Sequence, residues 1–169
     1  MFMKKGTVYA LCGKIASGKS TYARQMMEIS PALPLSCDEL VRRIMPGDLG
    51  DAHDATLARV KDYLLRKARE AADCGVDVIL DWGFWAREDR SAVRAYFADR
   101  GIPVKLYGIR ISDEDWQANI RERNAAILAG ENQIDYFVDD GLLSKLASLY
   151  EDPEEGELDL LVKISREKA

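Results

Sequence analysis

The segment Gly13–Ser20, which reads GKIASGKS, matches the G-x-x-x-x-G-K-[ST] spacing of a phosphate-binding P-loop. The apolar run Thr7–Cys12 precedes it and is typical of a buried strand. From Thr21 onward the chain has good helix formers, with no glycine or proline before Pro31. A strand, a glycine turn and a helix in this order form the context that the motif requires, which disfavours a chance glycine turn.

The residue types of this loop suit the phosphates of a nucleotide. Gly13 and Gly18 can adopt backbone angles closed to other residues, so that main-chain N–H groups can approach an anion. The following helix adds unpaired N–H donors and a positive dipole end. We expect Lys19 to reach the β- and γ-phosphates and the Ser20 hydroxyl to coordinate Mg²⁺. The predicted set that binds ATP comprises Gly13, Lys14, Ile15, Ala16, Ser17, Gly18, Lys19, Ser20 and Thr21.

Helical and strand patterns alternate along the whole chain, which predicts an α/β fold with a five-stranded, mostly parallel sheet between helices. The expected strands are Thr7–Cys12, Leu33–Cys37, Val76–Asp81, Val104–Arg110 and Leu158–Ile164. The pattern contains no linker and no repeat. Residues 1–169 are therefore expected to form a single α/β domain around the P-loop, which the resemblance described below identifies as a P-loop kinase domain.

Charge and cysteine content limit the partners of such a domain. The formal net charge is −5, which argues against a basic nucleic-acid-binding stripe, although contact with a single 5′ end stays open. Cys12, Cys37 and Cys74 form no C-x-x-C pair, so neither a disulfide framework nor a zinc site is expected. Reduced thiols predict a cytoplasmic protein, and no apolar run is long enough to span a membrane. The oligomeric state stays open.

Ligands of open parallel sheets bind beyond the carboxyl ends of the strands, where the sequence places Asp38 and Asp81. Ser36–Glu39 matches the S-x-x-E capping box, so Asp38 can belong to a helix start. It can also be the general base that accepts the proton of an attacking hydroxyl, and the two roles are compatible. Asp81 follows an apolar run, as a Walker-B carboxylate does, and is expected to contact Mg²⁺ or substrate; a helix N-cap is the alternative.

Three aromatic side chains surround a glycine in Trp82–Trp85, directly after the third predicted strand. Their spacing follows neither helical nor strand periodicity. They can belong to the core, or Trp82 and Trp85 can form the wall of a pocket against which a planar or sugar-like acceptor stacks. The sequence leaves both interpretations open.

The helix predicted from Asp113 carries Arg123 within its apolar stripe. That stripe consists of Trp116, Ile120 and Ile127. At about 100° per residue, Arg121 points roughly 120° away from it, which makes Arg121 the weaker catalytic candidate. A guanidinium on an inward face needs an anionic partner: either a migrating phosphate or a carboxylate such as Asp139 or Asp140.

Three further charged or titratable residues lie near the predicted site. Arg42 follows the predicted base by four residues and is a candidate substrate contact. His53 is expected at the surface, ahead of a helix capped by Asp54. Lys14 occupies a variable position of the motif and is expected to face solvent.

Taken together, Gly13–Ser20, Asp38, Val78–Asp81 and the arginines before Asn124 resemble a family of small P-loop kinases. This is the AAA-type group of predicted kinases similar to polynucleotide 5′-kinase domains, chloramphenicol phosphotransferase and zeta-toxin-like enzymes. The resemblance covers residues 6–164 and implies strand order 2-3-1-4-5, a short helical lid, ATP and Mg²⁺, and a hydroxyl acceptor. It also implies that Asp38 is the base, that Lys19 and Ser20 serve the phosphates and the metal, and that Arg121 and Arg123 lie in the lid.

One departure from the resemblance bears on the acceptor. The polynucleotide kinases have an arginine three residues after the base, where this chain has Val41, and Arg42 is turned from that direction by about 100°. Together with the acidic charge, this favours a small hydroxyl compound over a nucleic-acid 5′ end. A nucleotide-dependent switch that transfers no phosphoryl group is the third hypothesis.

Overall fold

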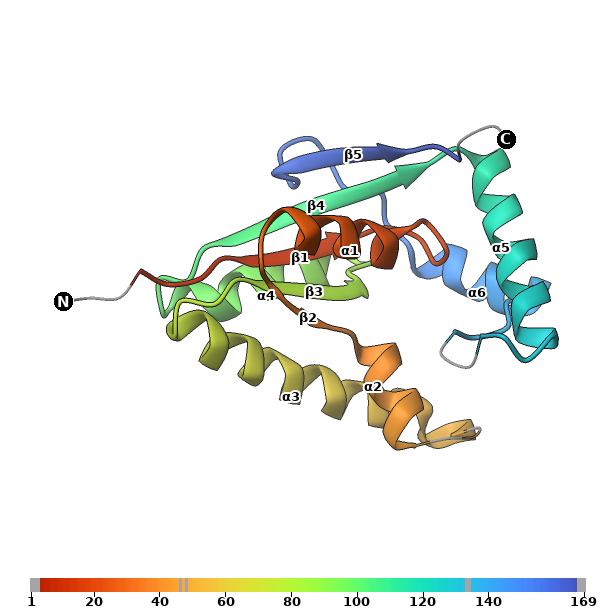
Figure 1. The fold of residues 1–169 in the computed structure, drawn as a ribbon, viewed down its shortest axis with the longest axis horizontal. Helices are drawn as coiled ribbons and strands as arrows, with labels where there is room; N and C mark the ends of the chain where they lie inside the picture. The colour runs from red at the N-terminus through yellow and green to blue at the C-terminus, as the bar shows by residue number, and fades with distance from the viewer. Residues whose placement is uncertain (1–3, 46, 48, 133–134, 167–169) are drawn as a thin grey trace.

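The computed structural model of the protein describes residues 4–45, 47, 49–132 and 135–166. Five parallel strands form one sheet in the order β2-β3-β1-β4-β5 (Figure 1). The strands are β1 (Val8–Cys12), β2 (Leu33–Leu35), β3 (Val78–Gly83), β4 (Val104–Ile111) and β5 (Leu160–Ile164). Every strand pairing in it is parallel. The predicted strand order is confirmed. Pro46, Asp48 and residues 133–134, which the sequence assigns to loops, lie outside the described residues.

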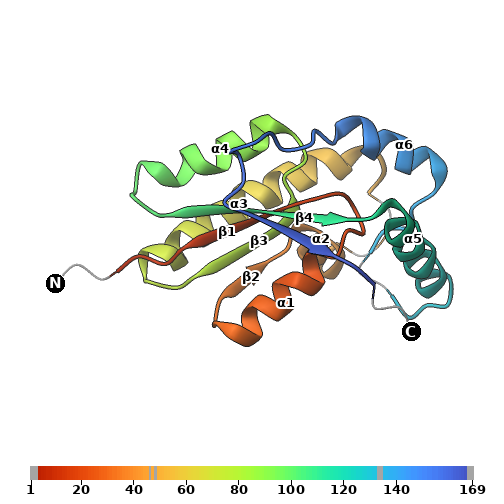
Figure 2. The same cartoon turned by 90° about the horizontal axis from the view of Figure 1, so that it is seen from above.

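Helices cover both faces of the sheet, as Figure 2 shows. They are α1 (Lys19–Ile29), α2 (Cys37–Ile44), α3 (His53–Asp73), α4 (Arg87–Ala98), α5 (Asp113–Leu128) and α6 (Asp140–Leu149). Val8 and Ala10 of β1 pack with α3 and α4, whereas Leu11 packs with Ala23 of α1 on the other face. Successive side chains of a strand point to opposite faces, which is why the buried β1 reads as a continuous apolar run.

The remaining helices gather at the carboxyl end of the sheet (Figure 1). Val41 of α2 packs on α3 through Val60 and Leu64. On the other side, Ile120 of α5 forms a small cluster with Ala16 of the P-loop and with Val138, against which α6 packs. The two helical units therefore stand on either side of the P-loop.

Helix caps set several boundaries. The Ser36 hydroxyl accepts a hydrogen bond from Glu39 N at 3.3 Å, so β2 stops at Leu35 and α2 begins at Cys37. Ser112 caps α5 in the same way. The predicted cap at Asp54 is wrong: a 3-10 turn at Gly50–Ala52 leads directly into α3, so that His53 is already its first helical residue.

Candidate active site

The loop between β1 and α1 has the curled backbone of a phosphate-binding loop. Gly18 adopts a left-handed conformation with φ of 93°, which glycine alone reaches without strain. At Gly13, a Cβ atom would lie 2.7 Å from the carbonyl oxygen of Ile109 and 2.8 Å from Ser17 Oγ. The local geometry therefore requires glycine at both positions. Helix α1 begins at Lys19, directly after Gly18, so its N-terminus lies at the end of this loop.

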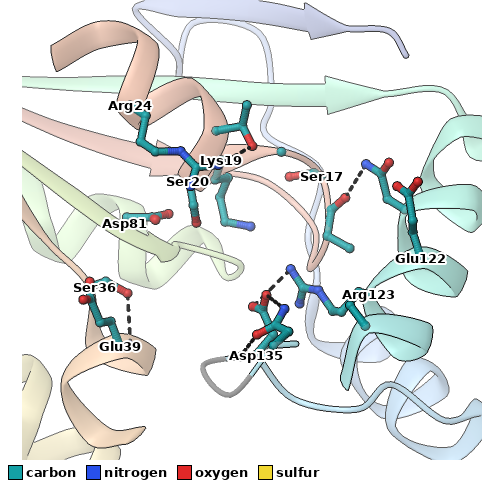
Figure 3. A pocket seen from close by; sticks show the side chains of 16 residues that line it. Ser17, Lys19, Ser20, Arg24, Ser36, Glu39, Asp81, Glu122, Arg123 and Asp135 are labelled. Atoms are coloured by element: carbon teal, nitrogen blue, oxygen red, sulfur yellow. Dashed lines mark hydrogen bonds and ion pairs between the residues drawn. The ribbon is translucent and has the colours of Figure 1, made fainter. Parts of the chain in front are cut away.

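A cleft of about 700 Å³ opens in front of this loop (Figure 3). It is lined by Ala16, Ser17, Gly18, Lys19, Ser20, Thr21, Arg24, Ser36, Glu39, Asp81, Asn119, Glu122, Arg123, Ala126, Asn132 and Asp135. In Figure 3 the side chains of Lys19, Ser20 and Asp81 point into one part of the cleft, with Arg123 and Asp135 across from them. Residues from β3, α1 and α5 therefore meet at the carboxyl end of the sheet, where ligands of parallel sheets bind.

The Lys19 ammonium lies against its own loop. Its Nζ donates hydrogen bonds to the carbonyl oxygens of Gly13 at 3.1 Å and Lys14 at 2.6 Å. Burial lowers the pKa of Lys19 and nearby Arg123 lowers it further, while Asp81 and Asp38 raise it. The two carboxylates therefore offset only part of the effect of burial on the Lys19 ammonium, and an anion in the cleft would stabilise its charged form.

Asp38 does not line the cleft itself but lies in the first turn of α2, between the cleft residues Ser36 and Glu39. Asp38 is an exposed residue as a whole, and partial desolvation of its carboxyl group is the main cause that raises the pKa of Asp38. Lys19 opposes the rise, and Asp81 and Asp135 add to it. The Asp38 carboxyl is therefore within electrostatic reach of the P-loop lysine. A raised pKa makes a carboxylate a better proton acceptor near neutral pH.

Arg123 faces the cleft, but its carboxylate partner differs from the predicted ones. Arg123 lies 3.3 Å from Asp135, not against Asp139 or Asp140. Asp139 is unavailable because its Oδ1 accepts the Leu142 N–H at 2.7 Å and so caps α6. Arg121 is exposed and does not line the cleft, which agrees with its direction on the helix.

Of the two interpretations that the sequence leaves open for Trp82 and Trp85, the pocket wall gains no support from the cleft, because neither residue lines it. β3 continues to Gly83, and Trp82 packs between the core clusters, with its ring 5.4 Å from that of Phe84. Trp85 instead donates its indole N–H to the carbonyl oxygen of Gly13 at 3.0 Å. The turn after β3 brings this side chain beneath the P-loop, a long-range contact that no local pattern reveals.

Arg42 reaches across to the segment that follows α5. Its guanidinium lies 4.0 Å from the centre of the Tyr136 ring and donates to the carbonyl oxygen of Asp135 at 3.4 Å. His53 Nε2 lies 3.2 Å from the Tyr136 hydroxyl, so His53 is half-buried, not a surface residue. Arg42 does not line the cleft itself. It holds Asp135 and Tyr136 near Asp38, whose charge raises the pKa of Tyr136 after the larger effect of burial.

Sequence reasoning missed several residues that line the cleft. Arg24, Glu122, Asn119, Asn132 and Asp135 were not predicted. The helical spacing could have suggested Asn119, since it lies four residues before Arg123 on neighbouring turns. Asp135 comes from an irregular segment whose position depends on tertiary contacts with Arg42 and Arg123.

The side chains at the P-loop fit a nucleotide with Mg²⁺. Ser17 is 1% exposed, and its Oγ has no hydrogen-bond partner among the residues that the structure describes, so a polar atom is available beside the loop. The Ser20 hydroxyl and the Asp81 carboxylate both face the cleft. Among the described residues no group of three His, Cys, Asp or Glu side chains could hold a metal alone. Ser20 and Asp81 are the residues that could hold Mg²⁺, an ion commonly bound by few protein ligands together with phosphates and water.

Within the described part of the chain no helix is long and apolar enough to cross a membrane. Its three cysteines are free, with Cys12 and Cys37 buried and Cys74 exposed.

A protein-family profile described as an AAA domain matches residues 8–139. A comparison with curated proteins finds no match. Among solved structures, the APS kinase of Mycobacterium tuberculosis in complex with AMPPNP and APS is 25% identical, with a TM-score of 0.65 over 97% of this chain and 91% of that one.

Two other solved structures share the fold at lower identity. A sugar kinase from Janibacter sp. is 18% identical, with a TM-score of 0.63 over 94% of this chain and 85% of that one. A chain of the Pnkp1/Rnl/Hen1 RNA repair complex is 15% identical, with a TM-score of 0.66 over 87% of this chain and 44% of that one. The first likeness covers both chains nearly in full, whereas the second spans less than half of the repair protein.

Proposed function

The chain belongs to the AAA domain family and has the fold of a small P-loop kinase, and from this premise we propose that it transfers the γ-phosphoryl group of ATP to a hydroxyl group of a small molecule. One observation carries the proposal. Lys19, Asp81 and Arg123 line one cleft, and Asp38 lies at its edge between Ser36 and Glu39, close enough for the charges of these three residues to affect its pKa. A proton acceptor opposite a phosphate-binding lysine is the arrangement that phosphoryl transfer to an alcohol requires.

Asp38 acts in this proposal as the general base. The acceptor oxygen forms a bond to the γ-phosphorus, its proton passes to the Asp38 carboxylate, and the bond to the bridging oxygen of ADP breaks. The raised pKa of Asp38, caused first by burial, supports this role, because the carboxylate then holds a proton more readily.

Cations on two sides of the cleft stabilise the transferring group. Lys19 leaves the carbonyl oxygens of its own loop to contact the terminal phosphates, and Arg123 approaches from α5. Ser20 and Asp81 would hold Mg²⁺, which neutralises phosphate charge when bound. Arg123 pairs with Asp135 at 3.3 Å, so this guanidinium can exchange a carboxylate for a phosphate as the substrates enter.

Acidic side chains at the acceptor end favour a small, uncharged or amino-bearing alcohol. Glu39 and Asp135 line the cleft together with Ser36 and Asn132. A polyanionic oligonucleotide would be repelled by these carboxylates, and also by the net charge of −5 on the protein. Hydroxyl and amide groups such as those of Ser36 and Asn132 suit the hydroxyl groups of a sugar-like compound.

The test is a transfer screen with γ-labelled ATP over nucleosides, sugars, aminoglycosides and 5′-hydroxyl oligonucleotides, run beside Asp38→Asn. We expect label on a small hydroxyl compound and its near-complete loss in the variant, since general-base catalysis contributes roughly 10²- to 10⁴-fold. Label on the oligonucleotide, with binding that falls steeply with salt, would identify an end kinase instead. Slow release of labelled inorganic phosphate without any labelled acceptor, equal in both proteins, would favour a nucleotide switch.

A further inference from the structure

The four consecutive carbonyl groups of Gly13 to Ala16 in the P-loop each accept a hydrogen bond from a side chain. The carbonyl oxygens of Gly13 and Lys14 accept from Lys19 Nζ, and that of Gly13 accepts also from Trp85 Nε1 at 3.0 Å. Ile15 O accepts from Trp116 Nε1 at 2.7 Å, and Ala16 O from Asn119 Nδ2 at 3.0 Å. A peptide group whose oxygen is fixed on one side directs the adjoining N–H to the other side, because the unit is planar.

Trp85 is itself rigidly placed. It follows Phe84, whose φ of 44° is unusual for a residue with a side chain. The Arg90 guanidinium, 1% exposed, donates to the carbonyl oxygens of both Phe84 at 3.2 Å and Trp85 at 3.0 Å, and pairs with Glu157. The Trp85 indole also fills the space beside Gly83, where a Cβ would lie 2.5 Å from Nε1. This buried arginine therefore fixes the turn that brings the indole to Gly13.

The other two donors come from α5. Trp116 and Asn119 are three residues apart, and Arg123 follows four residues later, so the three lie on neighbouring turns of one side of the helix. The Asn119 amide oxygen accepts from Arg166 at 3.1 Å, which directs its NH₂ group to Ala16. Arg123 lines the cleft and lowers the pKa of Lys19 after the larger effect of burial. The helix that supports the P-loop is thus also the one that carries the arginine facing it.

We propose that Trp85, Trp116 and Asn119 are positioning residues, which fix the P-loop through its carbonyl groups, and that Trp116 and Asn119 in addition set the distance between Arg123 and the terminal phosphate. The second part rests on the proposed site for ATP. Trp85 has the simpler role, because when Lys19 turns to a phosphate the indole remains as donor to Gly13 O.

The two roles predict different effects on nucleotide affinity. Trp85→Phe removes one N–H and keeps an aromatic ring, so ADP and a nonhydrolysable ATP analogue should both bind about three- to tenfold more weakly, the size of one lost hydrogen bond. Trp116→Phe and Asn119→Ala should weaken the ATP analogue by a further factor of about three or more relative to ADP, because Arg123 then no longer sits opposite the γ-phosphate. Gln117→Ala, an exposed change on the same helix, is the matched control and should alter neither affinity.

The experiment measures both affinities by calorimetry in these variants, alone and combined with Arg123→Ala. In the Arg123→Ala background, Trp116→Phe and Asn119→Ala should no longer change the ratio of the two affinities, whereas the loss caused by Trp85→Phe should persist. Melting temperatures identify any variant that fails to fold, and Asn119→Ala then replaces Trp116→Phe because it removes less buried surface.

Two results would overturn the inference. Unchanged ADP affinity in folded Trp85→Phe would remove the role in fixing the P-loop. The coupling to Arg123 would be refuted if Trp116→Phe and Asn119→Ala left the ratio of ATP-analogue affinity to ADP affinity unchanged. It would also be refuted if these variants changed this ratio by the same factor in the Arg123→Ala background. None of these measurements requires phosphoryl transfer, so a protein that binds ATP but labels no acceptor would refute the proposed function alone.

Discussion

The nucleotide side and the acceptor side of the cleft are built in different ways. On the nucleotide side, a contiguous loop is fixed by hydrogen bonds to its own carbonyl groups from Lys19, Trp85 and Trp116. On the acceptor side, residues far apart in the chain contact one another through side chains, as Arg42 does with Tyr136 and Arg123 with Asp135.

This difference explains why other proteins can have the same nucleotide site and yet use a different acceptor. Backbone groups bind phosphates whatever the side chains are, so the spacing of a few residues is enough to define the nucleotide side. Specific side chains shape the acceptor side, and a substitution there can alter the acceptor while the nucleotide site is kept. The following predictions test whether the two sides separate in this way.

The largest loss should follow removal of the P-loop cation. Lys19→Ala should lower kcat/KM for transfer by more than about 10³-fold, because the lysine stabilises charge on the transferring group. Lys14→Ala is the comparison: the Lys14 ammonium lies 4.8 Å from the centre of the Trp116 ring and does not line the cleft, so its loss should cost less than about threefold. Steady-state rates with the acceptor found in the transfer screen decide between these values. Similar losses in both variants would contradict the assignment.

Arg123→Ala should lower kcat by roughly 10²- to 10³-fold, somewhat less than loss of the lysine, since this arginine faces the cleft from α5. Arg121→Ala, two residues earlier and exposed, should have a small effect. Single-turnover rates with saturating ATP separate the two arginines. Equal losses would mean that α5 presents a different face to the phosphates.

On the acceptor side, Arg42→Ala should raise KM for the acceptor about tenfold and leave KM for ATP unchanged. The guanidinium holds Tyr136 and the Asp135 backbone near Asp38, and without it this segment is less ordered. Tyr136→Phe keeps the ring and should have a smaller effect, through loss of the contact with His53. Parallel changes in both KM values would show that the two sides are not separable.

The smallest effect concerns stability. Burial raises the pKa of Asp38 in the folded protein, so the unfolded chain loses this proton at lower pH than the folded protein does. The folded state is therefore penalised as pH rises through the raised pKa, and not below the unfolded value of about 3.9. Asp38→Asn should raise the melting temperature at pH 7, with a gain that shrinks toward pH 4. A lower melting temperature in the variant at pH 7 would contradict the raised pKa.

Much of the fold could be predicted because its signals are local. The order of strands and helices follows from hydrophobic patterns and from caps such as Ser36 and Ser112, whose hydrogen bonds lie within three residues. Asp54 failed as a cap because the preceding 3-10 turn already has helical angles. A side chain suited to capping is not sufficient where the backbone enters the helix smoothly.

Features that depend on long-range contacts could not be predicted. Nothing local distinguishes Trp82, which packs in the core, from Trp85, which reaches Gly13 across a separation of 72 residues. The partner of Arg123 was predicted among carboxylates of the right charge, but Asp139 serves α6 and Asp135 is brought in by Arg42. Residue type thus identified the charged groups, and tertiary packing decided which of them meet.

A crystal structure with a nonhydrolysable ATP analogue and Mg²⁺ tests the central claim most directly. We predict that the terminal phosphates lie in the loop formed by residues 13–20, that Lys19 has moved from the carbonyl oxygens of Gly13 and Lys14 to a phosphate oxygen, and that the Asp38 carboxyl faces the γ-phosphate. A nucleotide bound elsewhere, or an Asp38 carboxyl directed away from the γ-phosphate with the acceptor site filled, would contradict the account.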